Sequence, residues 1–84
     1  MKIGERVGAA REATKDVVYM YGYGTYQGME IPPDGFCNEV GLKNPKILLD
    51  NGKIIWGQEC WFGSEKRFNK EFIKDRKVVL VNLD

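Results

Sequence analysis

Two stretches of the chain alternate glycines with large aromatic rings. Residues 22–28 read Gly-Tyr-Gly-Thr-Tyr-Gln-Gly, and residues 56–63 read Trp-Gly-Gln-Glu-Cys-Trp-Phe-Gly. Glycine leaves the backbone open to close approach, and flat rings can stack on a planar ligand. Together the two stretches predict a binding surface, and neither has the pattern of a catalytic centre.

The candidate ligand-binding residues are of three chemical types. Aromatic rings can stack on a base, a carboxylate can accept a hydrogen bond from a hydroxyl or an amine, and cations can meet a phosphate. The rings are Tyr21, Tyr23 and Trp61, the carboxylate is Glu59, and the cations are Arg11 and Lys46.

Each of these residues also has a simpler explanation. Exposed rings are equally typical of a subunit interface. Glu59 can pair with a lysine of the neighbouring strand, and Arg11 with Glu12 or Asp16 on the surface. The glycines serve either sheet curvature under a covering ring or the close approach of a ligand. The sequence leaves these alternatives open.

The residues that catalysis most often uses are missing or poorly placed. The chain has no histidine, which removes the commonest general base and the commonest transition-metal ligand. Cys60 has aromatic neighbours and is typical of a buried apolar thiol. Two cysteines, Cys37 and Cys60, favour free thiols over a disulfide scaffold. We therefore expect no enzymatic activity, no cofactor and no metal site.

Length and charge restrict the class of protein. Eighty-four residues predict one domain over 1–84 with marginal stability, which an oligomeric contact would improve. A net charge of +1 makes nucleic acid an unlikely partner, although single-stranded binding remains the weakest alternative. The first residues lack the apolar core of a signal peptide, and no segment is apolar enough to span a membrane. We expect a cytoplasmic protein with no membrane partner.

The first half of the chain predicts two strands and a loop. Residues 5–12 and 17–28 are rich in strand formers, and in the second strand Tyr19, Tyr21 and Tyr23 share a face by the period of two. Residues 30–45 hold all three prolines and predict an irregular surface loop.

Asn51-Gly52 predicts a two-residue type I′ hairpin between strands at 47–50 and 53–56. Leu49 then opposes Ile54, and Ile47 opposes Trp56. In this register those four side chains point into the core, while Ile55 and Glu59 lie on the outer face.

The end of the chain predicts a helix and a strand. Ser64 caps a helix over 65–74 that packs Phe68 and Phe72 against the sheet. Residues 77–83 predict a strand, and because residues 78–81 are apolar on both faces, the strand is expected to be central. About five strands and one short helix predict a mainly β fold, either a small antiparallel barrel resembling SH3-like barrels or a curved sheet.

Three ordered motifs carry a resemblance to a known family. They are Gly22-Tyr23-Gly24-x-Tyr26-x-Gly28, Asn44-Pro45-Lys46-Ile47-x-Leu49-Asp50-x-Gly52 and Trp56-Gly57-x-Glu59-Cys60-Trp61-x-Gly63. Over most of residues 4–65 the chain resembles a family of small bacteriophage proteins. A cysteine commonly stands in that family where this chain has Gln58.

The resemblance implies a phage accessory protein that acts in the cytoplasm of the infected host. It implies an inhibitor akin to the anti-defence sponge proteins, which sequester cyclic or ADP-ribose-derived immune nucleotides, commonly as homo-oligomers. A protein-interaction module that blocks a host enzyme through the exposed aromatic residues is the alternative.

Overall fold

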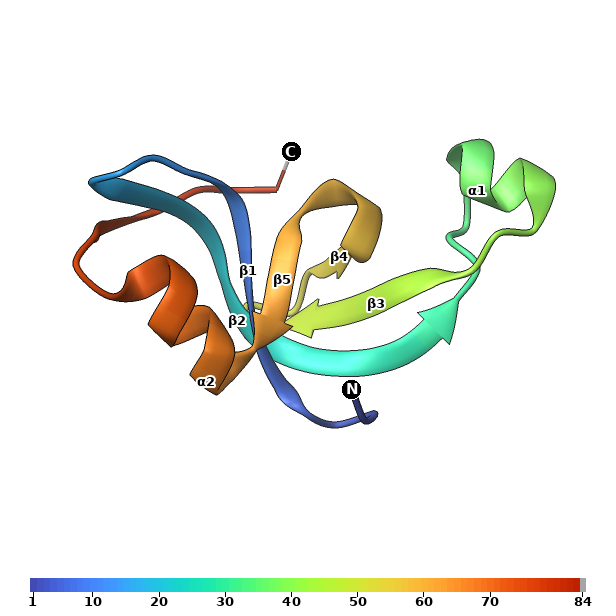
Figure 1. The fold of residues 1–84 in the computed structure, drawn as a ribbon. Helices are drawn as coiled ribbons and strands as arrows, with labels where there is room; N and C mark the ends of the chain where they lie inside the picture. Colours follow the sequence, from blue (N-terminus) through green and yellow to red (C-terminus); the bar gives the residue numbers. More distant parts are fainter. Residues whose placement is uncertain (84) are drawn as a thin grey trace.

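The computed structural model describes residues 1–83 and arranges most of them in one strongly curved β-sheet (Figure 1). The strand order is β4-β3-β2-β1-β5, with β6 beside β2. Among the strand pairs within residues 1–83, only β2 and β6 run parallel. The predicted mainly β fold is confirmed. The elements are β1 (Arg6–Ala13), β2 (Val17–Glu30), α1 (Gly35–Val40), β3 (Asn44–Leu49), β4 (Ile54–Trp56), η1 (Gly57–Glu59), β5 (Trp61–Ser64), α2 (Glu65–Phe68), η2 (Asn69–Ile73) and β6 (Lys77–Leu80).

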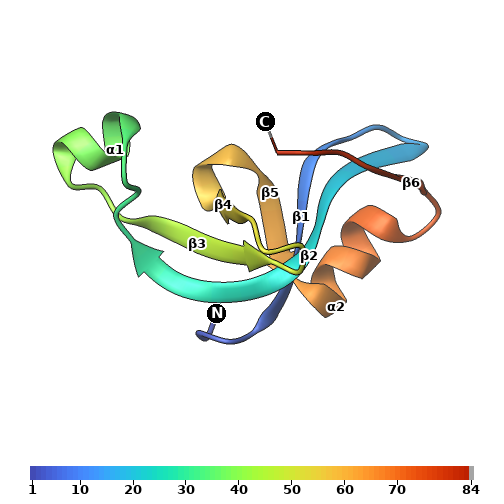
Figure 2. The same cartoon turned by 180° about the vertical axis from the view of Figure 1, so that it is seen from behind.

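Strand β2 organises the sheet because it pairs with three other strands. One of its edges pairs with β1, while β6 pairs with its first four residues and β3 with its second half. In both views β2 is a long arc, and its far end runs with β3 toward α1 as an arm (Figures 1 and 2). A single 14-residue strand therefore carries different partners at its two ends.

Gly22 changes the face to which the β2 side chains point. Its φ of 133° lies in a region that suits glycine. At this point β2 advances by two residues while β1 advances by one, so Tyr21 is the extra residue of a bulge. Tyr21 packs against one core cluster and Tyr23 against the other. The prediction that the two tyrosines share a face is wrong, because the bulge shifts the alternation.

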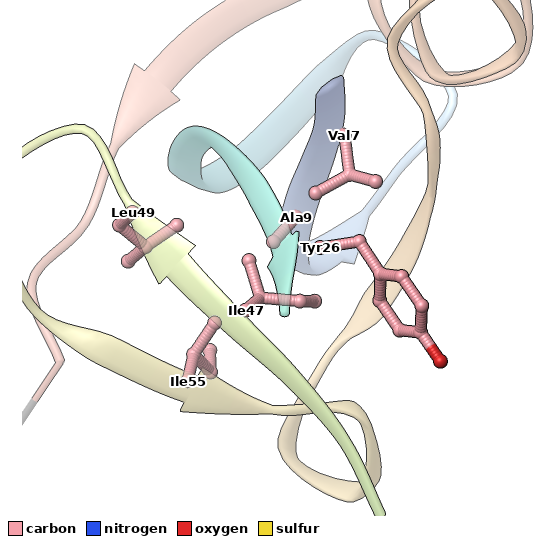
Figure 3. Close-up of a cluster of buried hydrophobic side chains, with 6 residues drawn as sticks. All are labelled: Val7, Ala9, Tyr26, Ile47, Leu49 and Ile55. Carbon is pink, nitrogen blue, oxygen red and sulfur yellow. The ribbon is translucent and has the colours of Figure 1, made fainter. Parts of the chain in front are cut away.

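The larger core cluster lies on one face of the sheet and draws on four strands, β1 to β4 (Figure 3). The small side chain of Ala9 on β1 packs among the aliphatic side chains of β3 and β4. The cluster is formed by Val7, Ala9, Tyr26, Ile47, Leu49 and Ile55.

The smaller core cluster lies beneath the helical segment. The chain turns through α2 and then a π-helical turn, η2, so the predicted helix over 65–74 is confirmed. Phe68 is 1% exposed and stacks on Phe72 with ring centroids 5.0 Å apart. Ser64 occupies the N-cap position but its side chain makes no capping hydrogen bond. The inward packing of the two phenylalanines anchors the helix to the sheet.

The predicted register of the hairpin is wrong by one residue. The structure pairs Ile47 with Ile55 and Leu48 with Ile54, around a three-residue turn whose third residue, Gly52, has a φ of 89°. The Asn51 side chain accepts a hydrogen bond from the Lys53 N–H at 2.9 Å. Asn51 keeps a negative φ, so a type I′ turn does not form. Ile55 is consequently buried, and Ile54 is 38% exposed.

Three further predictions of secondary structure need correction. The predicted irregular loop contains α1, a helix of six residues that ends at Gly41 with a φ of 70°. The predicted last strand is β6, which pairs only with β2 and lies at an edge. Its Leu80 is 72% exposed, because a short strand joining the end of β2 has no sheet on its other side. Residues 61–64 form β5, a separate strand that the sequence does not predict. The sequence pattern instead predicts that these residues continue the second strand of the hairpin.

Candidate functional site

The turn η1 positions Glu59. It links β4 to β5, and the Glu59 Oε1 accepts a hydrogen bond from the Trp56 N–H at 3.0 Å. A carboxylate that satisfies a free N–H at the start of a helical turn stabilises that turn. The bond fixes the direction of the Glu59 side chain, so the carboxylate is held in place before any ligand arrives.

Helix α1 braces the same turn through its buried cysteine. The Cys37 thiol donates to the Gln58 Oε1 at 2.8 Å, and the Asn44 Nδ2 donates to the Cys37 Sγ at 3.2 Å. Cys37 and Asn44 are both buried. Gln58 thus connects η1 to the arm.

Two glycines of the opening motifs have clear structural reasons, and a third does not. A Cβ on Gly57 would lie 2.8 Å from the Pro45 Cγ and 3.0 Å from the Phe62 ring, so η1 approaches β3 too closely for a side chain. Gly22 takes a positive φ, as described above. Gly63 has neither a positive φ nor any atom within 4 Å of an added Cβ. Its presence is not explained by contacts within the chain.

Four of the six predicted ligand-binding residues line two clefts that share residues. Arg11 and Glu59 line both clefts. Tyr21 lines the first, which has a volume of about 610 Å³, and Trp61 lines the second, of about 380 Å³. Each volume lies within the range of about 300–1,000 Å³ that is typical of small-molecule sites. The structure therefore brings together one cation, one carboxylate and two rings.

Arg11 is the cation of these clefts. Its guanidinium carbon lies 5.4 Å from the centroid of the Tyr19 ring, and its Nη2 lies 3.7 Å from the Glu12 Oε1. Both side chains of this ion pair are about half exposed. Because an exposed pair contributes only about 0–1 kcal/mol, Arg11 can turn to a phosphate at little cost.

Trp61 is the ring most open to solvent. It is 66% exposed, whereas Tyr21 is half-buried against the larger core cluster. Tyr21 therefore presents part of its ring as a fixed wall, and Trp61 is free to close over a ligand.

The other two predicted residues lie elsewhere. The Tyr23 hydroxyl donates to the Asn69 Oδ1, and its ring packs edge-on against Phe68 beneath the helical segment. Lys46 pairs with Glu30 on the arm, Nζ to Oε1 at 3.3 Å, and lines neither cleft. The bulge moves Tyr23 away, and the course of β3 along β2 moves Lys46 away.

Sequence reasoning missed several residues of the clefts. Asn82 and Leu83 follow β6, and Ile54 reaches the first cleft because the hairpin register differs from the prediction. Gln58 lines the second cleft. The parallel pairing between β2 and β6 joins residues that are far apart in the sequence, and no local residue pattern indicates it. The position of Asn82 in the first cleft could therefore not be predicted.

The thiol of Cys60 is held protonated at neutral pH. Burial, with the charge of Glu59 adding to it, raises the pKa of Cys60 to about 12. Its Sγ lies 3.6 Å from the Trp56 carbonyl oxygen. Both cysteines are free thiols. Within residues 1–83, no group of three or more His, Cys, Asp or Glu side chains is placed to hold a metal ion.

One further observation concerns the helices. None of those in the described part of the chain has the length and apolar character needed to cross a membrane. Comparison with known proteins adds no identification: no family model, no curated protein and no solved structure matches this chain.

Proposed function

We propose that this chain binds and sequesters a small nucleotide-type ligand, a cyclic nucleotide or an ADP-ribose derivative. The observation that carries the proposal is the convergence of Arg11, Tyr21, Glu59 and Trp61 on two adjoining clefts. Because Arg11 and Glu59 line both clefts, a ligand with two ring systems joined through phosphate fits them better than a single ring does.

Each residue has a role that follows from its chemistry. Arg11 offers paired N–H donors to a phosphate, which suits the geometry of that group. Tyr21 and Trp61 stack on planar groups, each contact being worth about 1–3 kcal/mol. One oxygen of Glu59 is engaged by the Trp56 N–H, and the other accepts from a ribose hydroxyl or a base amine.

The proposed role is binding without catalysis. A nucleophilic cysteine needs a lowered pKa, and the raised pKa of Cys60, about 12, is the opposite condition. The chain contains no histidine to act as a general base. Sequestration needs affinity alone, and the rings and Arg11 can supply it.

The resemblance to small bacteriophage proteins suggests in which biological setting the ligand would be bound. We propose that the chain is an anti-defence sponge that removes an immune nucleotide from the cytoplasm of an infected host. It would thereby inhibit the host enzyme that the nucleotide activates.

Thermal denaturation of the purified chain with a panel of cyclic mononucleotides, cyclic dinucleotides and ADP-ribose derivatives tests the proposal. We expect at least one ligand to raise the melting temperature. Arg11→Ala and Glu59→Gln should weaken its binding by about tenfold or more, since a hydrogen bond to a charged group is worth about 1.5–3 kcal/mol.

Lys46→Ala is the matched control, because it removes a cation that lies outside both clefts. Failure of every ligand to shift the melting temperature, together with failure of the chain to deplete such nucleotides from infected-cell lysate, would overturn the proposal. Equal weakening by Lys46→Ala would place the ligand elsewhere.

A second candidate function is inhibition of a host protein, and the arm favours it. The arm projects from the sheet and ends in α1 (Figure 2). Phe36, Val40 and Leu42 are each more than half exposed there. Apolar groups gathered at an exposed tip are typical of a protein contact. Capture of one host protein in equal amounts, lost in Phe36→Ser but kept in Arg11→Ala, would favour this candidate over the first.

A further inference from the structure

Strand β5 has one free edge. It pairs with β1 through Trp61 to Ser64 and is the last strand in the pairing order of the sheet. Within residues 1–83, no second strand pairs with it. Edge strands are usually protected by shortness, charge, proline or a bulge, and β5 is short, with four residues. The sequence Trp-Phe-Gly-Ser has no charge and no proline, and its pairing with β1 has no bulge.

A groove of about 610 Å³ is lined by all four residues of β5, together with Met1 and Glu5 near the start of the chain. Tyr26 lines one side, and Arg67 and Phe72 from the helical segment line the other. An additional strand therefore has both space and a row of backbone groups to pair with.

Trp61 and Gly63 of β5 combine a large exposed ring with an open position two residues away. Trp61 pairs with Ala10 and Gly63 with Gly8, so the two residues point to the same face. Trp61 is 66% exposed. Gly63 has open space where a side chain would stand, and its backbone does not require glycine. A glycine inside a strand often marks a place where another group lies close to the backbone.

We propose that two copies of this chain pair through β5, antiparallel, so that the Trp61 ring of each copy covers the partner's Gly63. In an antiparallel pair, residues directly opposite each other point to the same face. Pairing Phe62 with the partner's Phe62 places Trp61 opposite the partner's Gly63, and the two-fold axis repeats this contact. One register thus accounts for the exposed ring and for the bare glycine.

A second copy fits this edge better than an unrelated peptide does. The contact is self-complementary, as a two-fold interface must be, because the large ring and the open position lie two residues apart on one strand. An aromatic ring over a glycine on the neighbouring strand is a known way of stabilising a sheet. The added burial also suits a chain of 84 residues, whose own core is small. The pairing needs no ligand, but a Trp61 ring that covers the partner's Gly63 is not available to stack on a ligand in the second cleft.

Sedimentation of the unliganded chain across a concentration series tests the pairing. We expect a mass of twice 9.6 kDa for the wild type. Gly63→Leu should give the monomer mass, because its side chain fills the position of the partner's Trp61. Trp61→Ala should raise the dissociation constant by more than about tenfold, as expected for a central tryptophan. Circular dichroism confirms that both variants fold.

Leu80→Ala is the matched control, since Leu80 is an exposed apolar residue on the other edge strand, β6. We expect it to leave the dimer unchanged. A wild type that stays monomeric at about millimolar concentration, or an assembly that survives Gly63→Leu, overturns the proposal.

The register has its own test. Opposed residues on paired strands come within disulfide range, whereas positions two residues out of register do not. We expect the double variant Trp61→Cys, Gly63→Cys to form a crosslinked dimer on mild oxidation, with a 61-to-63 crosslink identified by mass spectrometry. Each single variant should stay uncrosslinked at these positions. A crosslink in Gly63→Cys alone, or a 61-to-61 crosslink in the double variant, contradicts this register.

Discussion

The guanidinium of Arg6 holds the carboxylate of Asp50 with two parallel hydrogen bonds, Nη1 to Oδ1 and Nη2 to Oδ2, each 2.7 Å long. Arg6 begins β1, and Asp50 begins the turn after β3, 44 positions later. The Asp50 N–H also donates to the Tyr23 carbonyl at 2.9 Å. The turn of the hairpin is therefore fixed to both β1 and β2.

This ion pair makes the stability of the fold depend on acid. Hydrogen bonding to Arg6 lowers the pKa of Asp50. A carboxylate of this kind stabilises the fold above its unfolded pKa, about 3.9, and the contribution is lost as pH falls through the folded pKa. We expect Asp50→Asn to lower the urea midpoint more at pH 7 than at pH 2.5. The effect should be small and weakened by salt, because both side chains are exposed.

Asp34→Asn is the control for that measurement, because the exposed Asp34 side chain makes no capping hydrogen bond to α1. It should change the urea midpoint little at either pH. An equal loss at pH 7 and pH 2.5 in Asp50→Asn would show that the ion pair contributes nothing.

Phe68→Ala should destabilise the chain by about 3–5 kcal/mol, because it empties the centre of the smaller core cluster. The Phe68 ring lies against the backbone of Gly8 and stacks on Phe72. Phe36→Ala makes the same chemical change at a residue that is 69% exposed, and should alter stability by about 0.5 kcal/mol or less. Urea unfolding of both variants measures the loss in the free energy of unfolding. Similar values for the two would mean that the helical segment is not packed as described.

Gly57→Ala should damage the candidate site as well as the fold. The added Cβ would meet Pro45 at 2.8 Å, so η1 must move away from β3, at a cost of about 1–3 kcal/mol. Glu59 moves with η1, and the chain should then bind its ligand more weakly. Gly63→Ala, measured at a concentration where the chain is monomeric, is the control, since its Cβ meets no atom within 4 Å. Unchanged stability in Gly57→Ala would contradict the close packing of η1.

The fold class and most elements could be predicted because their signals are local. Strand formers in 17–28, the turn at Asn51-Gly52 and the spacing of Phe68 and Phe72 each act within a few residues. The predicted hairpin register was wrong, and the reason is also local. The side chain of Asn51 accepts the Lys53 N–H, which favours a three-residue turn over the two-residue one.

The candidate site was predictable only in part. Arg11, Glu59 and Trp61 come together because β1, η1 and β5 are neighbours, as a short sheet requires. The prediction for Tyr23 was wrong because the bulge beside Gly22 reverses the faces to which successive side chains of β2 point. A glycine in a strand does not by itself predict a bulge. Asn82 enters the first cleft through the parallel pairing of β6 with β2, a long-range choice with no periodic pattern.

Tyr23 should make the fold sensitive to alkali. Burial, and to a smaller extent the charge of Glu65, raises the pKa of Tyr23. The hydroxyl donates to the Asn69 Oδ1 only in its protonated form, so this hydrogen bond also favours the neutral phenol. A group whose folded pKa is raised contributes stability below its unfolded pKa, about 10, and the contribution is lost as pH rises through the folded pKa. Tyr23→Phe should cost about 0.5–1.5 kcal/mol at pH 7, from the lost hydrogen bond, and should reduce the loss between pH 9 and 11.

Urea midpoints across that pH range measure the effect of Tyr23→Phe. Tyr19→Phe is the matched control, because the half-buried Tyr19 ring lies beneath Arg11 and the hydroxyl that bonds to Asn69 is that of Tyr23. Parallel pH curves for the wild type and Tyr23→Phe would mean that the Tyr23 hydroxyl does not lose solvent on folding.

Cys60 should resist alkylation in the folded chain. With a pKa of about 12, its thiolate fraction at pH 8 is smaller by roughly three orders of magnitude than that of a thiol with the ordinary pKa of about 8.5. We expect iodoacetamide to react at least about 100-fold more slowly with the native chain than with the urea-unfolded chain. Cys37→Ala isolates the signal of Cys60. A native rate close to the unfolded rate would mean that Cys60 forms a thiolate readily, and the case for binding without catalysis would then lose its chemical support.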